Sequence, residues 1–342
     1  MSKIFIVGHP GLYGGAGSEL HHQIILWRKH MDLDVTIIPS MEGFKGEPLR
    51  QEMLDLGVKY ADKARDYSLV TEDDLVMNFC GKEFLEDLPL INKHTKKTAF
   101  INCMTFLFDN EKKMHRDGLI KYSLYQRQGV LEPHKAILRN DFNSQAEFIL
   151  FNPYFYHKES PNENLRVDDR FTIGRISRQD TDKFAKNTFH IWEYAVAPVL
   201  KRGLVLGYDG RSEKKTGKPP GWVQTFRDQN ALSVSDFYAS CDVIVQSTDT
   251  TENLPRIGFE AMHAGIPLVV DNRGGWKHMI EHEVTGFRCN TPQEFIYWTS
   301  RLAFEPELRS EIADAAKQWA IMASGVSVAK KSWSKFFNKV FK

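Results

Sequence analysis

Two glutamates eight residues apart form the strongest candidate for chemistry in this chain. Glu252 and Glu260 lie at an expected strand-to-helix turn, in a helical stretch Asn253–Ala264 that Gly265-Ile266-Pro267 ends, and Glu260 is expected to open the helical face. The start of a helix offers free backbone N–H groups and the positive end of a dipole, which suit a phosphate. A carboxylate accepts hydrogen bonds from two neighbouring hydroxyls, which suits a ribose or hexose diol. Taken singly, each glutamate is also typical of an ordinary helix with solvated charges.

The residues that follow extend this pattern. Asp271–Trp276 contains a Gly-Gly pair, and Val284–Phe287 contains a Thr-Gly turn. A Glu, seven residues, a second Glu, an Ala-rich helix, Gly-x-Pro, a strand, Gly-Gly and Thr-Gly therefore occur in order. This order and spacing resemble the carboxy-terminal domain of family 4 glycosyltransferases with the GT-B fold, over most of residues 170–300. The resemblance implies an α/β protein in which two doubly wound Rossmann-like domains face across a cleft and a last helix crosses back to the first domain.

A basic segment after an expected strand agrees with this resemblance. Ile173–Lys183 looks like the family's Gly-Arg…Lys diphosphate clamp, with Arg175 and Lys183 as its cations. Two cations there would neutralise charge on a leaving nucleoside diphosphate. The spacing from Arg175 to Lys183 is longer than in many members, so Arg178 competes with Lys183 for this role. A solvated basic loop is the alternative interpretation.

A glycine-rich loop follows the first expected strand. Pro10–Gly17 opens a helix and resembles the family's loop whose backbone, here at Gly14 and Gly15, approaches the donor phosphates. A dinucleotide-binding loop is the obvious rival. The pattern is not G-x-G-x-x-G, however, and no acidic residue closes the second strand, which ends at Ile37–Ser40. These two departures argue against a Rossmann dehydrogenase.

The resemblance assigns a role to each donor-side residue. Glu252 would bind the donor sugar's hydroxyls, Glu260 the ribose diol, and Arg175 with Lys183 the diphosphate. Backbone groups of Leu254, Arg256 and Ile257 would assist. Pro255 departs from the pattern because it has no N–H, for which the Arg256 guanidinium would compensate.

Residues for the base and the acceptor are assigned from shorter matches. Val223–Arg227 matches the family's strand and loop beside the base, so Phe226 and Arg227 are candidates to contact it. The family often places a polar residue after the fourth strand of the amino domain, where this chain has Asn102 and Thr105. The residues of this segment include no histidine.

The resemblance implies a retaining glycosyltransferase that moves a sugar from a nucleotide-diphosphate sugar, UDP- or GDP-linked, to an acceptor hydroxyl. The leaving diphosphate would take the acceptor's proton, and the protein would supply positioning and charge. No metal and no cofactor are expected. Two Asp-x-Asp sequences, at 32–34 and 180–182, lack the strand-end context that a metal site needs and are interpreted as solvated charges.

Short apolar runs bounded by Gly, Pro, Asn or Asp predict the strands that position these residues. The expected strands are Ile4–Val7, Val35–Ile38, Leu75–Met77, Ala99–Ile101, Ala136–Leu138, Phe148–Phe151, Phe171–Ile173, Leu204–Leu206, Trp222–Val223, Val243–Val245 and Ile266–Val270. Helical patterns include Ser18–His30, with Glu19 in its first turn, Gln293–Ala303 and Ser327–Phe341. A polar linker over 152–170 divides the chain, so we expect an acceptor-side domain at 1–152, a donor domain at 153–322 and a returning helix at 323–342.

Composition bounds the remaining choices. The 342 residues carry 45 Lys+Arg and 44 Asp+Glu, which argues against a strongly basic nucleic-acid binder. No apolar run approaches the roughly 18 residues of a membrane helix, and Met1–Gly8 lacks a signal-peptide pattern, so a cytoplasmic protein is expected. The acceptor stays open among a glycan, a lipid, a small molecule and a modified DNA base. The alternatives are a nucleotide-sugar epimerase of the same fold and a non-catalytic nucleotide- or carbohydrate-binding descendant.

Overall fold

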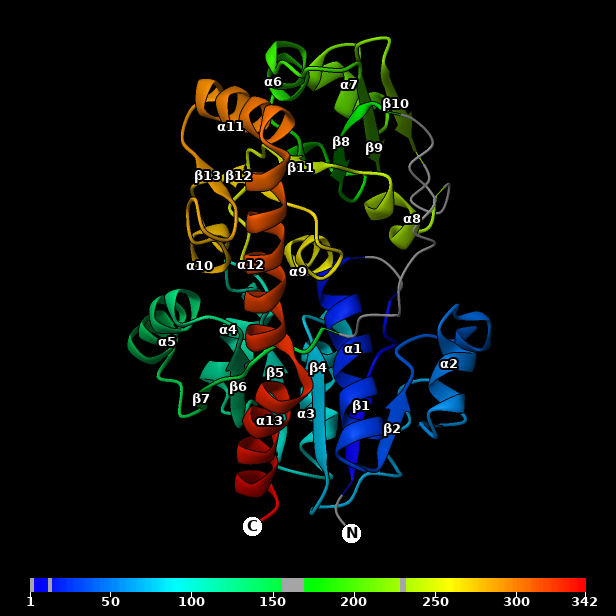
Figure 1. Ribbon diagram of the computed structural model, residues 1–342. Helices are drawn as coiled ribbons and strands as arrows, with labels where there is room; N and C mark the ends of the chain where they lie inside the picture. Colours follow the sequence, from blue (N-terminus) through cyan, green and yellow to red (C-terminus); the bar gives the residue numbers. More distant parts are fainter. Residues whose placement is uncertain (1–2, 12–13, 156–168, 228–231) are drawn as a thin grey trace. The chain divides into compact units, whose positions relative to one another are not determined.

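The computed structural model describes residues 3–11, 14–155, 169–227 and 232–342 (Figure 1). The chain divides into two compact units. Unit 1 contains Met1–Tyr156 and Ala323–Lys342, and unit 2 contains His157–Met322. Each unit is an α/β sandwich with its own parallel sheet and its own core, so each is described separately.

Unit 1 is built on a seven-stranded sheet in the order β3-β2-β1-β4-β5-β6-β7. Every strand pair in it is parallel, and most of the strands are buried along their whole length, as is typical of parallel sheets covered on both faces. The strands are β1 (Ile4–Val7), β2 (Val35–Ile38), β3 (Lys59–Tyr60), β4 (Leu75–Phe79), β5 (Thr98–Ile101), β6 (Tyr122–Tyr125) and β7 (Glu147–Leu150).

Helices cover both faces of this sheet. Alternate strand residues point to opposite faces, so Ile4 and Ile6 belong to one core cluster and Phe5 and Val7 to the other. The first cluster includes side chains of α1 and α13, and the second includes those of α3 and α4. The helices are α1 (Gly15–His30), η1 (Phe44–Gly46), α2 (Arg50–Asp55), α3 (Lys82–Ile91), α4 (Asp109–Arg116), α5 (Gln128–Phe142) and α13 (Val326–Val340).

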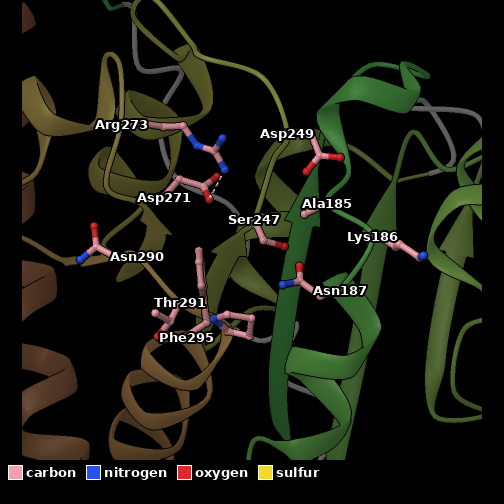
Figure 2. Close-up of a pocket in the computed structure, with 11 residues that line it drawn as sticks. Ala185, Lys186, Asn187, Ser247, Asp249, Asp271, Arg273, Asn290, Thr291 and Phe295 are labelled. Atoms are coloured by element: carbon pink, nitrogen blue, oxygen red, sulfur yellow. Dashed lines mark hydrogen bonds and ion pairs between the residues drawn. The ribbon is translucent and has the colours of Figure 1, made fainter.

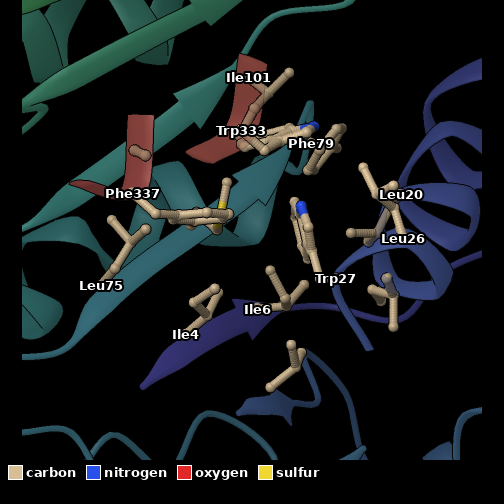
Figure 3. Close-up of a cluster of buried hydrophobic side chains, with 14 of the residues drawn as sticks. Ile4, Ile6, Leu20, Leu26, Trp27, Leu75, Phe79, Ile101, Trp333 and Phe337 are labelled. Atoms are coloured by element: carbon tan, nitrogen blue, oxygen red, sulfur yellow. The ribbon is translucent and has the colours of Figure 1, made fainter. Parts of the chain in front are cut away.

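The last helix, α13, completes the core of unit 1 (Figure 3). The Trp333 ring meets the Trp27 ring edge-on, with 4.9 Å between their centroids. Trp333 Nε1 donates to Gln23 at 2.6 Å, and Gln23 donates to Glu19 at 2.5 Å. The predicted return of the last helix to the first unit is confirmed. Glu19 was expected in the first turn of α1, which is wrong, because α1 begins at Gly15 and Glu19 lies buried in its second turn.

Unit 2 is built on a six-stranded parallel sheet in the order β10-β9-β8-β11-β12-β13. Its strands are β8 (Phe171–Ile176), β9 (Lys201–Leu206), β10 (Val223–Phe226), β11 (Val243–Gln246), β12 (Leu268–Asp271) and β13 (Phe287–Cys289). Its helices are η2 (Thr181–Lys183), α6 (Thr188–Tyr194), α7 (Gly210–Thr216), α8 (Val234–Ala239), α9 (Arg256–His263), α10 (Trp276–Met279) and α11 (Pro292–Phe304). Helix α12 (Pro306–Ser324) follows and ends at the boundary between the units.

The strand order of unit 2 reverses at β8, which lies between β9 and β11. The chain leaves β8 toward one side of the sheet and leaves β11 toward the other. Loops that diverge at such a point leave a crevice outside the carboxyl ends of the strands, where open α/β sheets bind ligands. The segments that follow β8 and β11 carry Lys183 and Glu252.

The α/β fold class is confirmed, but several elements were predicted wrongly or missed. Ala136–Leu138 is not a strand but part of α5, whose buried residues Val130, Leu131, His134 and Leu138 follow a helical spacing. Strand β6 was missed because Tyr-Ser-Leu-Tyr is not a continuous apolar run. The two-residue β3, β13 and the long helix α12 were also missed. Within the described ranges, no helix is long and apolar enough to cross a lipid bilayer.

Candidate active site

The loop after β8 and the turn before α9 meet through an ion pair. Lys183 Nζ lies 2.5 Å from Glu252 Oε1, and each side chain is about one-fifth exposed. The predicted phosphate-binding cation and the predicted sugar-binding carboxylate therefore contact each other at the carboxyl edge of the sheet. They are 69 positions apart in the chain. This pair brings together the two strongest sequence signals.

Arg175 lies beneath this pair rather than beside it. Its side chain is fully buried, its guanidinium lies 4.4 Å from the centroid of the Phe184 ring, and it donates a hydrogen bond to the Lys183 carbonyl. Burial lowers the pKa of Arg175 to about 10, against the opposing effect of Asp271 and other nearby carboxylates, so the side chain stays charged at neutral pH. Arg175 thus supports the backbone that carries Lys183, and its guanidinium is not exposed to a ligand here.

Arg178, the rival of Lys183 for the clamp, lies at the surface. Its side chain is 56% exposed and pairs with Asp180 at 3.5 Å. Asp180 also caps η2 by accepting a hydrogen bond from the Asp182 N–H at 3.1 Å. Of the two rivals, the structure places Lys183 against Glu252. The Asp-x-Asp sequence at 180–182 serves to shape this loop.

The Gly-Gly pair of the motif fixes the backbone of Glu252. The N–H of Gly275 donates to the Glu252 carbonyl at 2.7 Å. Gly274 has a φ of +53°, and a Cβ at this position would lie 2.5 Å from the same carbonyl oxygen. Only glycine lets the 272–275 turn approach this closely. The spacing between the glutamate and the Gly-Gly pair therefore has a structural reason: the turn holds the main chain from which Glu252 projects.

Helix α9 begins later than predicted. It starts at Arg256, with Pro255 as its N-cap, because the residue before a proline is disfavoured in the helical conformation. The expected start at Asn253 is therefore wrong, and Glu260 lies in the second turn rather than at the opening of the helix. Leu254 and Arg256 are buried, and Ile257 is half-buried. The first N–H groups of α9 point out of the N-terminal end of the helix, a position that suits an anion.

Glu260 has a partner that the sequence analysis did not find. The Tyr238 hydroxyl donates to Glu260 Oε2 at 2.9 Å. Burial raises the pKa of Glu260, while the Tyr238 hydrogen bond and the charge of Arg256 oppose that rise. Tyr238 lies in α8, whose start was readable from Ser233 and Asp236, a Ser-x-x-Asp pattern in which Ser233 caps the helix. A half-buried carboxylate held by a phenol is suited to bind a diol.

The two candidate base contacts lie at the end of β10. The Phe226 carbonyl accepts hydrogen bonds from the N–H groups of Gly207 at 2.9 Å and Tyr208 at 3.0 Å. The Arg227 carbonyl accepts one from the Gln179 side chain at 2.5 Å. The ends of β8, β9 and β10 are therefore linked at one edge. Residues 228–231 lie outside the described residues.

A pocket of about 430 Å³ lies next to this site without containing it (Figure 2). Two of its lining side chains are bonded to each other, since Asp271 accepts from Arg273 at 2.9 Å. Asp271 also accepts from the Thr248 hydroxyl, and the Thr291 hydroxyl caps α11. No residue of the predicted donor site lines it. The lining residues are Ala185, Lys186, Asn187, Ser247, Asp249, Asp271, Arg273, Asn290, Thr291, Pro292 and Phe295.

The candidate residues of unit 1 lie at the carboxyl edge of its own sheet. Gly14, with a φ of +89°, and Gly15 form the start of α1. Asn102 is buried and donates to Glu111 at 2.8 Å, so it shapes its loop rather than facing a ligand. Thr105 is exposed.

Glu111 is a buried group that the sequence analysis missed. Its Oε2 accepts from Asn102 and, at 3.1 Å, from the Phe108 N–H. Its Oε1 and the nearby Tyr125 hydroxyl are buried with no hydrogen-bond partner among the described residues. Burial raises the pKa of Glu111 to about 7. The loop that carries both acceptor-side candidates therefore rests on a carboxyl group that titrates near neutral pH.

Comparison with known sequences identifies part of unit 2. Residues 223–319 match the family model of the glycosyl transferases group 1. The putative glycosyltransferase YtcC of Bacillus subtilis is 34% identical over 91 residues, which are 26% of this chain and 22% of YtcC. The glycosyltransferase 1 domain-containing protein 1 of Xenopus tropicalis is 34% identical over 73 residues, 21% of each chain. This chain thus spans about a fifth of the length of these curated relatives.

Solved structures match along the whole chain. HepE from Anabaena in complex with UDP-glucose has a TM-score of 0.74 at 16% identity, over 99% of this chain and 100% of HepE. A TarM variant from S. aureus in complex with UDP has a TM-score of 0.70 at 11% identity, over 99% of this chain and 100% of TarM. Likeness at such low identity shows the fold alone. It confirms the predicted GT-B fold. The match of residues 223–319 to the group 1 family model agrees with the family resemblance found in the sequence over most of residues 170–300.

Proposed function

We propose that this chain, whose residues 223–319 match the family model of the group 1 glycosyl transferases, moves a sugar from a nucleoside-diphosphate sugar to an acceptor hydroxyl with retention of anomeric configuration. The donor binds at the carboxyl edge of the sheet in unit 2. The acceptor belongs to unit 1, where the exposed Thr105 lies in the candidate loop. The acceptor class stays open among a glycan, a lipid, a small molecule and a modified DNA base.

The Lys183–Glu252 ion pair is the observation that carries this proposal. The ammonium and the carboxylate neutralise each other at 2.5 Å. A nucleoside-diphosphate sugar offers each of them a partner: phosphate oxygens for Lys183 and sugar hydroxyls for Glu252. Glu260 lies eight residues further along and is available to the ribose diol. One substrate thus engages the ion pair and the second glutamate together.

The bond between the anomeric carbon and the β-phosphate oxygen breaks, and the acceptor oxygen bonds to the same face of that carbon. The acceptor's proton passes to the departing phosphate oxygen, so no protein nucleophile is required. Lys183 and the first N–H groups of α9 stabilise the charge that develops on the leaving group. We propose that these cationic and dipolar groups suffice without a metal ion.

A donor-hydrolysis screen tests the proposal, because slow transfer to water needs no acceptor. Release of nucleoside diphosphate is measured across UDP- and GDP-linked sugars. We expect turnover of at least one donor, unchanged by EDTA, and a decrease of about ten- to a hundredfold in Glu252→Gln. Glu311→Gln, at an exposed position of α12, is the matched control and should behave as wild type.

Three outcomes would contradict this account. Absence of nucleoside-diphosphate release with every donor would indicate a binding protein instead of an enzyme. Turnover in Glu252→Gln equal to that of wild type would show that Glu252 is not part of the site. Loss of turnover in EDTA with recovery on adding manganese would show that a metal is needed. NMR of the first product separates retention from inversion, and a free epimerised sugar would indicate an epimerase.

A further inference from the structure

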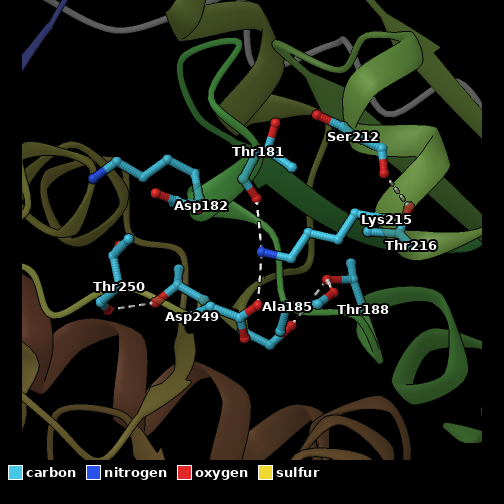
Figure 4. Close-up of polar contacts among 12 residues, drawn as sticks. Thr181, Asp182, Ala185, Thr188, Ser212, Lys215, Thr216, Asp249 and Thr250 are labelled. Carbon is cyan, nitrogen blue, oxygen red and sulfur yellow. Dashed lines mark hydrogen bonds and ion pairs between the residues drawn. The ribbon is translucent and has the colours of Figure 1, made fainter.

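Lys215 in α7 joins the two segments that carry Lys183 and Glu252 (Figure 4). Its ammonium donates to the Thr181 carbonyl in η2 at 3.0 Å. The same ammonium lies 2.6 Å from Asp249 Oδ2, in the segment between β11 and α9. The side chain is 22% exposed, so most of it is packed between these segments. One cation therefore contacts both halves of the candidate donor site.

The residues around Lys215 orient α7 so that Lys215 contacts the loop after β8. Asp209 caps α7 by accepting hydrogen bonds from the N–H groups of Arg211 and Ser212, and Ser212 is fully buried. This orientation lets Arg211 donate to the Gln179 carbonyl at 2.9 Å, one turn before Lys215 reaches Thr181. Helix α7 thus contacts the loop after β8 at two carbonyls. Of the two side chains that make these contacts, Arg211 and Lys215, it is Lys215 that also contacts Asp249.

The two segments also meet through backbone hydrogen bonds and through the Lys183–Glu252 pair. After η2, the Ala185 N–H donates to the Ser247 carbonyl at 3.1 Å. The Asp249 N–H reaches the Asp182 carbonyl only at 3.3 Å. The Lys183–Glu252 pair must open if Lys183 is to bind phosphate and Glu252 is to bind sugar. The contact between Lys215 and Asp249 involves neither of these residues, so it need not break when their pair opens.

We propose that Lys215 is a positioning residue, which holds the η2 loop against the 247–252 segment so that Lys183 and Glu252 face one donor. This inference rests on the proposed function and deepens it. Lys215 does not touch the donor. It acts through Thr181 on one side and Asp249 on the other, and Asp249 is therefore its necessary partner.

The test compares Lys215→Met, Asp249→Asn and the double variant for donor hydrolysis and for binding of UDP and GDP. Each single variant should raise the donor KM by about tenfold or more, since a small misplacement of binding groups is costly. The double variant should be no worse than either single one, because both remove the same contact. Lys215→Arg should restore most of the affinity. Lys214→Met, at the exposed neighbouring position, is the control and should match wild type.

The outcomes separate this inference from the proposed function. If wild type neither binds nucleotide nor hydrolyses any donor, the proposed function fails. If wild type is active and Lys215→Met matches it, the positioning role is wrong. If Asp249→Asn binds nucleotide more tightly while Lys215→Met binds it more weakly, Lys215 itself contacts the phosphates and the inference is overturned. If Lys215→Met does not fold, Asp249→Asn and Lys215→Arg test the same inference. Asp249→Asn should then raise the donor KM and Lys215→Arg should keep most of the affinity, and a wild-type KM in Asp249→Asn would contradict the positioning role.

Discussion

At the scale of single residues, the two glutamates of the motif differ in what already holds them. Glu252 pairs with Lys183, which could bind a phosphate in place of this carboxylate, whereas Glu260 accepts a hydrogen bond from the Tyr238 phenol. In the proposed function, Glu252 binds the sugar that reacts and Glu260 binds a ribose that is only held. This difference predicts different kinetic roles.

We therefore expect Glu260→Ala to weaken nucleoside-diphosphate binding and Glu252→Ala mainly to lower turnover. Loss of a hydrogen bond to a charged group costs roughly 1.5–3 kcal/mol, which is about ten- to a hundredfold in affinity or rate. Calorimetry with UDP and GDP measures the first effect, and donor hydrolysis at saturation measures the second. Tyr238→Phe keeps the Glu260 carboxylate and should have a smaller effect on binding. Unchanged affinity in Glu260→Ala would remove Glu260 from the ribose site.

Residue identity was easier to predict than residue exposure. Glu252 and Glu260 were chosen from their spacing and Lys183 from the family resemblance, and the structure places Lys183 and Glu252 in contact. The buried position of Arg175 was not predictable, because it depends on packing against Phe184. Tyr238 and Lys215 were missed because they reach the site from helices that the motif does not include.

At the scale of elements, the acceptor-side loop rests on α4 through Glu111. The groups near this carboxyl group are Asn102 and the Phe108 N–H from the loop, Lys112 from α4 and Tyr125 from β6. Only one of its oxygens has a partner among the described residues, so its charge is poorly compensated when it ionises. The stability of unit 1 should therefore depend on pH.

Burial raises the pKa of Glu111 from an ordinary value of 4.5 to about 7. Between these values the folded chain holds a proton that the unfolded chain has lost, so the free energy of unfolding falls as pH rises through this window. The fall amounts to at most about 3 kcal/mol. Glu111→Gln should remove most of it and should be more stable than wild type at pH 8, in urea unfolding across pH 4.5–8. Glu86→Gln, on the surface of α3, is the control. An equal pH dependence in Glu111→Gln and wild type would contradict this account.

Strands whose sequence shows a short apolar run and no competing helical pattern were predicted well. β1 and β2 have the predicted bounds, because each is a short, mostly apolar run with a charged residue before it and Gly8 or Pro39 after it. The error at Ala136–Leu138 came from reading three apolar residues without their neighbours, whose helical spacing decides the outcome. The start of α9 was placed too early because the effect of Pro255 on the preceding residue was not applied.

At the scale of the whole molecule, the chain returns to its first unit to finish the core. Trp333 is fully buried against Trp27 and bonds to Gln23. Trp333→Ala should therefore lower the free energy of unfolding by about 3–5 kcal/mol, the usual cost of truncating a buried tryptophan. Lys331→Ala, on the exposed side of the same helix, should change it little. Urea unfolding followed by circular dichroism measures both, and an effect of Trp333→Ala below about 1 kcal/mol would contradict the packing of α13.

The central claim is that unit 2 holds a nucleoside-diphosphate sugar through Lys183 and Glu252. Calorimetric titration of wild type and Lys183→Met with UDP, GDP and the corresponding nucleosides tests it most directly. We predict that wild type binds one diphosphate, that Lys183→Met binds the same diphosphate about ten- to a hundredfold more weakly, and that the nucleoside binds both proteins alike. Equal affinity of the two proteins for the diphosphate would contradict the account.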